Sequence, residues 1–339
     1  MPQSVRSFAA VSSLLPTVTI IVPARPGESR ILALDAVRAL DYPRERMNMI
    51  VARGKQPSVQ RNIAIKSAQG DLIYFLDDDA RPVAGALRRA AEHFSRADVQ
   101  MVGGPNVCPV DAPWIERLFA VVLSSRLAFG PSRARYLPVG DIRESSEKEL
   151  ILCNLVARRQ TLVDLGGFDE SLYPNEENAL MDDIQKRGGK LLYDPDVIVE
   201  RRPRPNLKAF IKMLLTYGRG RAEQFRLHPT FGSALNFVPP LFCVYLLAMA
   251  VLAVVAMTKS RVDWLAVAFI PLLLYLLCVV AQTAASSVRH GFARSLAAMP
   301  LIVLTHIFYG LGFWRGLFTR LGGKTARPAV DVALEQVRW

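Results

Sequence analysis

Cysteine and histidine are both scarce in this sequence, and their arrangement excludes several kinds of site. The four cysteines and four histidines show none of the paired spacings that a zinc site requires. Without paired cysteines, no disulfide framework is predicted, as is usual in a reducing compartment. Residues 1–16 are too weakly apolar for a signal peptide. Internal repeats and low-complexity segments are also absent from the sequence.

Acidic residues are outnumbered, since 30 Asp and Glu face 42 Lys and Arg for a formal net charge of +12. A basic protein attracts nucleic acid, anionic lipid or phosphorylated substrates. No zinc-finger spacing and no aromatic RNA-binding motif is present, so nucleic acid is not expected as a partner. Apolar residues are plentiful at 51%, and their excess is concentrated after Ala234. The average composition therefore describes two different regions.

The first eighty residues alternate between β-branched apolar runs and helical patterns. Strands are expected at residues 17–22, 47–51 and 72–76, with helices at 31–40 and 58–68. Ser58 is predicted to cap the second helix, and Gly70 follows its end. This order predicts a nucleotide-binding α/β domain with a mostly parallel central sheet.

Three adjacent carboxylates, Asp77, Asp78 and Asp79, follow the apolar run 72–76. Open α/β sheets bind ligands at the carboxyl ends of their strands, which is where these side chains are expected. A divalent cation relieves the repulsion among them, and Mg²⁺ is typically held by one or two carboxylates plus substrate phosphates. The alternative for such a triplet is a solvated acidic loop.

Two further loops are expected at the same edge of the sheet. The loop after the first strand carries Pro23, Arg25 and Glu28, and Arg53 follows the second strand. Because the carboxyl ends of parallel strands meet, these residues are placed to contact a nucleotide.

The segments VTIIVPAR, SVQRNIAIKSAQGDLIYFLDDDARP and GGFDESLYPNEENALMDDIQKRGGKLLYDP together resemble family-2 glycosyltransferases of the A-type fold. The resemblance covers roughly residues 17–205. The later segments RRPRPNLKAFIKMLLTYGRGRAEQFRLHP and HIFYGLGFWRGLF resemble the membrane-attached subgroup typified by the succinoglycan glucosyltransferase ExoA. The fold class implied is a nucleotide-diphospho-sugar transferase domain followed by transmembrane helices.

The resemblance also implies roles for individual residues. Asp77 and Asp78 would bind the nucleotide sugar, with Asp77 near the ribose. Asp79 would be the direct ligand of Mg²⁺ or Mn²⁺ with Asp77 beside it, which identifies the triplet with the DXD motif. Arg61 and Asn62 match an Arg-Asn pair that approaches the diphosphate, although Arg61 could equally cap its own helix.

Glu176 and Glu177 match the acidic pair of the family, whose second member is usually the general base. Glu177 is therefore the predicted base and Glu176 its partner, since paired carboxylates favour a raised pKa on one member. The alternative for this pair is capping of the helix 178–186 by acidic residues.

One departure from the family pattern concerns the nucleotide. An acidic residue that reads the base commonly follows the second strand, whereas this chain has Ala52, Arg53 and Gly54 there. A UDP-sugar is the expected donor by resemblance, and this departure leaves the base open.

The C-terminal third of the sequence predicts attachment to a membrane. Residues 201–232 form a basic amphipathic segment, and each Lys or Arg near an anionic leaflet contributes about 1 kcal/mol. Apolar stretches at 235–257, 264–284 and 296–318 are each near the roughly 20 residues that cross a bilayer. The domains expected are 1–200 (catalytic), 201–232 (interface), 233–320 (transmembrane) and 321–339 (tail).

The charges flanking these stretches conflict with three crossings. A cytoplasmic catalytic domain and three crossings would place the basic tail outside, against the positive-inside tendency. The third stretch, which contains Pro300, His306 and Gly310, could instead be re-entrant.

The function expected is a metal-dependent, inverting hexosyltransferase of polysaccharide assembly in the bacterial inner membrane. It would be multi-pass with a cytoplasmic catalytic domain, and would move sugar from a nucleotide-diphosphate sugar to a lipid-linked (polyprenyl-diphosphate) saccharide. A second hypothesis is a polyprenyl-phosphate glycosyltransferase, which charges the bare lipid phosphate. A third, from another class, is an inactive membrane scaffold or sugar-binding partner.

Overall fold

The computed structural model describes residues 15–172, 175–227, 231–259, 263–319 and 331–338. The predictions for residues 1–14, and for 321–330 of the tail, lie outside this part of the chain. Two compact units are formed: the first comprises 1–109, 134–202 and 323–339, and the second 110–133 and 203–322.

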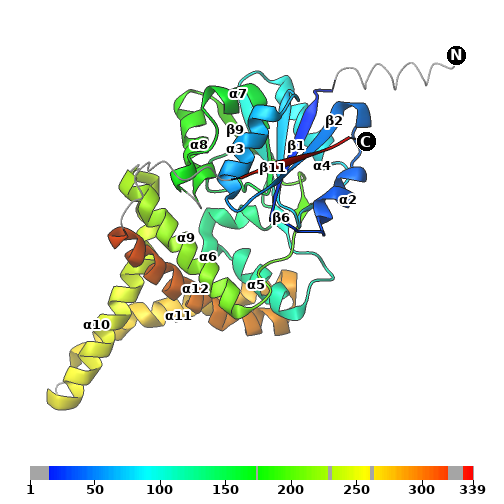
Figure 1. Cartoon of the computed structure of the whole chain (residues 1–339). Helices are drawn as coiled ribbons and strands as arrows, with labels where there is room; N and C mark the ends of the chain where they lie inside the picture. The colour runs from blue at the N-terminus through cyan, green and yellow to red at the C-terminus, as the bar shows by residue number, and fades with distance from the viewer. Residues whose placement is uncertain (1–14, 173–174, 228–230, 260–262, 320–330, 339) are drawn as a thin grey trace. The chain divides into compact units, whose positions relative to one another are not determined.

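The first unit is built on an eight-stranded mixed sheet in the order β11-β2-β1-β3-β8-β5-β9-β7 (Figure 1). Its strands β2, β1 and β3 are parallel, as predicted. The α/β fold expected from the sequence is confirmed, with parallel strands at the centre of a mixed sheet. The strands are β1 Val18–Ala24, β2 Met47–Arg53, β3 Leu72–Leu76, β5 Val99–Gly103, β7 Arg143–Glu144, β8 Asn154–Arg158, β9 Lys190–Tyr193 and β11 Ala333–Val337.

Both faces of this sheet are covered, which explains why its central strands read as continuous apolar runs. Successive side chains alternate between two cores, so that Tyr74 enters one core and its neighbours Ile73 and Phe75 enter the other. The first core includes α2 (Leu32–Arg38) and α4 (Ala86–Glu92). The second includes α3 (Pro57–Ser67), α7 (Arg159–Asp164) and α8 (Glu176–Lys186).

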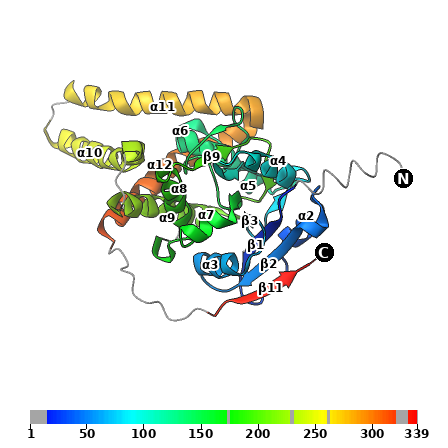
Figure 2. The same ribbon diagram turned by 90° about the horizontal axis from the view of Figure 1, so that it is seen from above.

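The last strand of the first unit comes from the far end of the chain. β11 pairs antiparallel with β2, from Ala333 opposite Arg53 to Val337 opposite Met49 (Figure 2). Part of the predicted tail is therefore an edge strand of the sheet.

A small second sheet, in the order β4-β10-β6, lies in the same unit. Its strands are β4 Arg81–Pro82, β6 Asn106–Val107 and β10 Val199–Glu200. Because Glu200 lies opposite Arg81, the pairing brings Arg201 back to the residues that follow β3.

The start of α3 differs from the prediction. Ser58 was expected as its cap, but the helix begins at Pro57 with Gln56 as the N-cap residue. Proline is well suited to the first helical position because its missing N–H would have no partner there.

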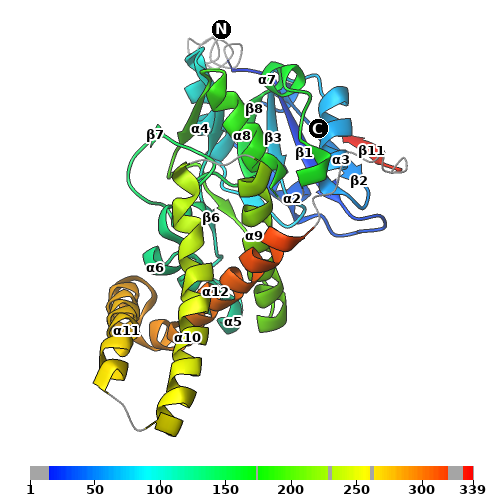
Figure 3. The same ribbon diagram turned by 90° about the vertical axis from the view of Figure 1, so that its left-hand side faces the viewer.

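The second unit is helical. Its helices are α5 Trp114–Leu123, α6 Arg126–Phe129, α9 Leu207–Leu227, α10 Val238–Lys259, α11 Asp263–His290 and α12 Phe292–Phe318. α12 contacts α5, α9, α10 and α11 (Figure 3). Within the described residues, three helices are long and apolar enough to cross a membrane, in the segments Ala234–Ala256, Ala266–His290 and Phe292–Phe318. Short 3₁₀ helices are η1 Arg44–Arg46, η2 His93–Ser95, η3 Gly130–Arg135, η4 Glu170–Leu172 and η5 Phe231–Phe237.

The basic amphipathic segment contains α9, whose apolar side meets protein. Phe210 stacks on Phe119 of α5, with ring centroids 4.3 Å apart. A Cβ on Gly218 would lie 2.1 Å from the backbone oxygen of Tyr309 in α12. α9 and α12 are thus in backbone contact, and the assignment of residues 201–232 to a membrane interface stays a prediction.

Candidate active site

The acidic triplet directly follows β3, whose five residues are all buried. The backbone oxygen of Asp78 accepts a hydrogen bond from the N–H of Ala33 in α2 (3.1 Å), and the backbone oxygen of Asp77 accepts one from Ala80. Burial, and then the neighbouring carboxylates of Asp79 and Asp77, raise the pKa of Asp78. The triplet is therefore a fixed turn of the backbone at the carboxyl end of a central strand.

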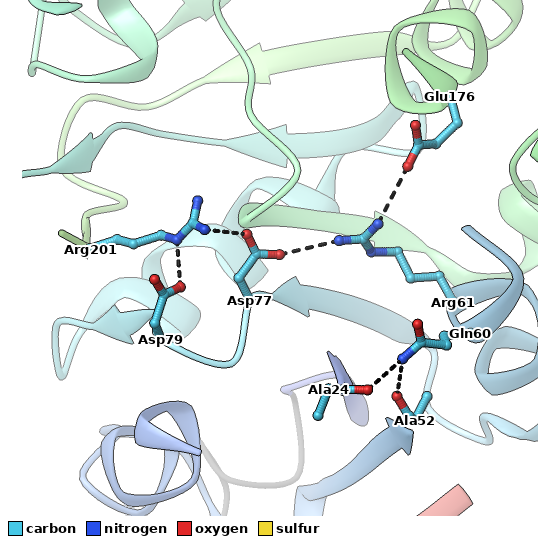
Figure 4. Close-up of polar contacts among 8 residues, drawn as sticks. All are labelled: Ala24, Ala52, Gln60, Arg61, Asp77, Asp79, Glu176 and Arg201. Atoms are coloured by element: carbon cyan, nitrogen blue, oxygen red, sulfur yellow. Dashed lines mark hydrogen bonds and ion pairs between the residues drawn. The ribbon is translucent and has the colours of Figure 1, made fainter. Parts of the chain in front are cut away.

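Arg201 bridges two of these carboxylates (Figure 4). Its Nε lies 2.5 Å from Oδ1 of Asp79, and its Nη2 lies 3.1 Å from Oδ2 of Asp77. Arg201 was predicted to belong to the membrane-facing segment 201–232, and its position beside these carboxylates was not predicted. Only the pairing of β10 with β4, two-residue strands far apart in the sequence, reveals it.

Arg61 joins the triplet to the acidic pair (Figure 4). Its Nη2 lies 3.2 Å from Oδ1 of Asp77, and its Nη1 lies 3.5 Å from Oε1 of Glu176. The side chains of Arg61 and Glu176 are only 6% and 2% exposed. Asp77 therefore lies between two guanidinium groups, and the predicted Arg61, Asp77, Asp79 and Glu176 are brought together.

The two members of the acidic pair have different surroundings. Glu176 opens α8 and is buried, whereas Glu177 is partly exposed in the same first turn. Burial, followed by repulsion from Glu177, raises the pKa of Glu176 to about 7, although Arg61 opposes the shift. Its Oε2 atom is buried and has no hydrogen-bond partner among the described residues.

The raised pKa of Glu176 predicts how stability varies with pH. The folded chain holds this proton up to about pH 7, whereas the unfolded chain releases it near the ordinary value of 4.5. The stabilisation is therefore complete below pH 4.5 and is lost as the pH rises through 7. The slope can reach about 1.4 kcal/mol per pH unit.

Thermal unfolding of the full chain and of Glu176→Gln, measured from pH 5 to 8, checks this expectation. The variant should show a flatter decline of Tm with pH, because glutamine does not titrate. Parallel curves for the two proteins would contradict the raised pKa.

Gln60, on α3, fixes the ends of the first two strands. Its Nε2 donates to the backbone oxygens of Ala24 (2.9 Å) and Ala52 (2.5 Å) (Figure 4). Because Ala24 is the last residue of β1 and Ala52 the last but one of β2, one buried amide sets the spacing of the loops that follow. Gln60 was not predicted as a site residue, since a lone glutamine on a helix carries no signal of such a contact.

Asn62 holds the Gly-Gly-Phe-Asp-Glu turn. It accepts from the N–H of Phe168 and donates to the oxygen of Phe168, both at 2.8 Å. Gly167 has φ +80°, and a Cβ there would lie 2.4 Å from Oδ1 of Asn62. The structure thus gives Asn62 a part in positioning the turn before α8, and its predicted approach to a diphosphate stays a prediction.

The loop residues at the ends of β1 and β2 are partly brought together. Arg53 donates from Nη1 to the backbone oxygen of Glu28 (2.8 Å) and from Nε to Glu335 of β11 (3.1 Å). Pro23 lies within β1, and Arg25 is exposed. Arg53 is thereby held against the first loop, with its orientation set partly by the C-terminal strand.

Asp77 and Asp79 are the candidate protein ligands for a divalent cation. No group of three or more His, Cys, Asp or Glu side chains suited to a metal is found within the described ranges. Asp77 and Asp79 nevertheless offer hard oxygen ligands, and Asp79 is 43% exposed. Two carboxylates match the way Mg²⁺ is usually bound, with substrate phosphates and water completing its shell. The residues present fit such an ion, provided that Arg201 releases one carboxylate.

A known protein family matches the part of the chain that contains both acidic motifs. The model of "Glycosyl transferase family group 2" matches residues 72–281, which begin at β3 and include both acidic motifs and the first apolar helices.

Individual relatives and one solved structure extend the comparison. The chain is 28% identical over 175 residues to the pre-mycofactocin glycosyltransferase of Mycobacterium tuberculosis. The aligned stretch covers 52% of this chain and 36% of the relative. It therefore spans about a third of that relative. It is 24% identical over 335 residues to the succinoglycan biosynthesis protein ExoA of Rhizobium meliloti, covering 88% and 94% of the two chains.

The solved mannosyltransferase PcManGT from Pyrobaculum calidifontis, in complex with GDP-Man and Mn²⁺, has a similar fold. Its TM-score is 0.55 with 17% identity, over 91% of this chain and 88% of that one.

Proposed function

The chain belongs to glycosyl transferase family group 2, and from this premise we propose that it is a membrane-bound, inverting glycosyltransferase. Its donor is a nucleotide-diphosphate sugar and its acceptor a lipid-linked (polyprenyl-diphosphate) saccharide. The observation that carries the proposal is the cluster of Asp77 and Asp79 with Arg61, Arg201 and Glu176 at the end of β3. Its arginines suit an anionic sugar donor, and the carboxylates at α8 suit an acceptor that must lose a proton.

The donor's diphosphate needs cations. A Mg²⁺ or Mn²⁺ ion held by Asp79 with Asp77 would act as a Lewis acid and neutralise the leaving group. Arg61 and Arg201 are the fixed positive charges beside these carboxylates, and planar guanidinium groups bind phosphate oxygens in pairs. The complex of PcManGT with GDP-Man and Mn²⁺ supports a nucleotide sugar and a divalent metal ion as ligands of this fold. A UDP-sugar is the donor we propose.

The acceptor's hydroxyl needs a base. Glu177 takes its proton as the acceptor oxygen bonds to the anomeric carbon from the side opposite the departing phosphate oxygen. The bond to that oxygen breaks, the nucleoside diphosphate leaves with the electron pair, and the configuration inverts. Glu176, the neighbour of Glu177, is buried, and its ion pair with Arg61 holds that guanidinium group in place.

Support for membrane attachment comes from the second unit. The three long apolar helices, together with the similarity to ExoA over most of both chains, support polysaccharide assembly at a membrane. We call the first unit, which carries this site, the catalytic unit. We propose that it lies on the cytoplasmic side of a bacterial inner membrane, where nucleotide sugars are made.

The test is sugar transfer by the purified full-length protein in detergent or vesicles. Radiolabelled UDP-, GDP- and dTDP-hexoses are each supplied with a lipid-linked acceptor extract, and labelled lipid is measured with Asp79→Asn as the inactive control. Label on a saccharide-bearing lipid diphosphate supports the proposal. Label only on added polyprenyl phosphate would favour the lipid-charging alternative, and no transfer from any donor would favour a scaffold.

A further inference from the structure

We propose that this protein crosses the membrane twice, as a hairpin of α10 and α11, while α12 lies with α9 along the membrane surface. The proposal rests on the membrane attachment proposed above. It places β11 on the same side of the membrane as the other strands of the first unit.

The first argument is the position of β11 in the sheet of the first unit. Five residue pairs join it to β2, and Glu335 meets Arg53 at 3.1 Å. Val332, Leu334 and Val337 pack against the two cores of that unit. The strand is therefore an integral part of the catalytic fold.

This position fixes the parity of the crossings. The chain leaves the first unit after Arg202 and returns to it in β11. A folded α/β unit cannot lie on both sides of a bilayer, so the helices between these points must cross an even number of times. Of the three candidate helices, at most two can span the membrane.

The helix that does not cross is identified by its packing. In the most apolar 18-residue stretch of each helix, only 11% is buried in α10 and in α11, against 44% in α12. Leu247 in α10 and Val267 in α11 are 67% and 66% exposed. Such long apolar surfaces are not stable in water, and each helix has the roughly 20 residues that hydrocarbon requires. Lipid is the partner that fits them.

α12 instead runs alongside α9. A Cβ on Gly312 would lie 2.3 Å from the oxygen of Leu215, and one on Gly316 would lie 2.4 Å from that of Arg219. Further along, Nη1 of Arg226 donates to the oxygen of Gly316 at 3.1 Å. The two helices therefore stay in contact over several turns, and the second half of α12 lies at the depth of α9.

α9 cannot lie in hydrocarbon. Its charged residues are Lys208, Lys212, Arg219, Arg221, Glu223 and Arg226. Each Lys or Arg at the bilayer centre costs about 2.5–3.5 kcal/mol or more. At the surface the same residues face anionic headgroups, so α9 and the α12 segment beside it belong at the interface.

The distribution of charge gives an independent argument. Two crossings leave only the segment that joins α10 to α11, with two basic residues and one acidic residue in 259–263, on the far side. The basic residues Arg289, Arg294, Arg315, Arg320, Lys324 and Arg327 all stay on the catalytic side. The conflict with the positive-inside tendency, which three crossings would create, is removed. Gly291, with φ +82°, forms the bend between α11 and α12.

Cysteine labelling of the full-length protein in oriented membrane vesicles tests the proposal. Lys259→Cys probes the end of α10, and Asp331→Cys probes the residues just before β11. Asp35→Cys marks the side of the catalytic unit, because that side chain is 83% exposed. A membrane-impermeant maleimide is applied to right-side-out and inside-out vesicles, with the unsubstituted chain as the background for its own cysteines.

Asp331→Cys should be labelled in the same vesicles as Asp35→Cys, and Lys259→Cys in the opposite ones. Labelling of Asp331→Cys opposite Asp35→Cys would overturn the proposal in favour of an odd number of crossings. Labelling of all three from one side would overturn it in favour of a hairpin that does not span.

The proposed reaction is assayed separately on the same preparations, so an inactive protein with the expected labelling would count only against the reaction. Loss of the protein from vesicles in a carbonate wash would instead refute the membrane attachment itself.

Discussion

Replacing Asp79 with asparagine is expected to reduce sugar transfer by about 10³-fold or more. The change keeps the shape of the side chain but removes its charge, so a divalent ion loses its direct protein ligand. Electrostatic stabilisation of a leaving group is commonly the largest single contribution to such a reaction, and a metal ion supplies several kcal/mol of it. Turnover, together with nucleotide binding measured by calorimetry with and without Mg²⁺ or Mn²⁺, checks the expectation.

Asp78→Asn is the matched control, because it lies one residue away and its backbone oxygen still anchors α2. Its loss should be much smaller than that of Asp79→Asn. Normal turnover in EDTA, or in Asp79→Asn itself, would exclude the proposed role of a metal.

Glu177→Gln should lower transfer by about 10² to 10⁴-fold, the usual contribution of a positioned general base. Glutamine has the same shape and no basicity, so the nucleotide sugar should bind normally and the loss should appear in kcat rather than KM. The partial exposure of Glu177 suits contact with an acceptor. Single-turnover measurements with a lipid-linked saccharide separate binding from chemistry.

Glu176→Gln is the internal comparison, and it should cost less than Glu177→Gln. A crippled Glu176→Gln beside a nearly normal Glu177→Gln would move the base by one residue, to the buried member whose pKa is about 7. Near-normal turnover in both would refute a general base and favour a phosphate acceptor, which is already ionised.

The sequence predicted those parts of the fold that depend on local patterns. β1, β2 and β3 were identified from β-branched apolar runs, since a strand covered on both faces needs no polar alternation. The three apolar helices were found from length and hydropathy alone. The family resemblance singled out Arg61, Asp77 and Glu176 one by one, but their contact with one another was not predicted, because their separation along the chain carries no local signal.

The parts that were not predicted depend on contacts between distant segments. Arg201 lies 122 residues from Asp79 in the sequence, and its basic neighbours pointed to lipid rather than to a carboxylate. Gln60 acts through two backbone oxygens, which no side-chain motif records. Ser58 resembled a helix cap, but Pro57 already fits the first turn without a side-chain acceptor.

The pairing of β11 with β2 also determines when the protein can finish folding. Arg53 and Glu335 are separated by 282 residues, and a ribosome adds about 5–20 residues per second, so β2 waits roughly 15–60 s for its partner. During that interval its outer edge presents unpaired N–H and C=O groups, a template for pairing with other chains. With the two crossings proposed above, insertion of α10 and α11 would precede closure of the sheet, and nascent or prematurely terminated chains would be the species most exposed to aggregation.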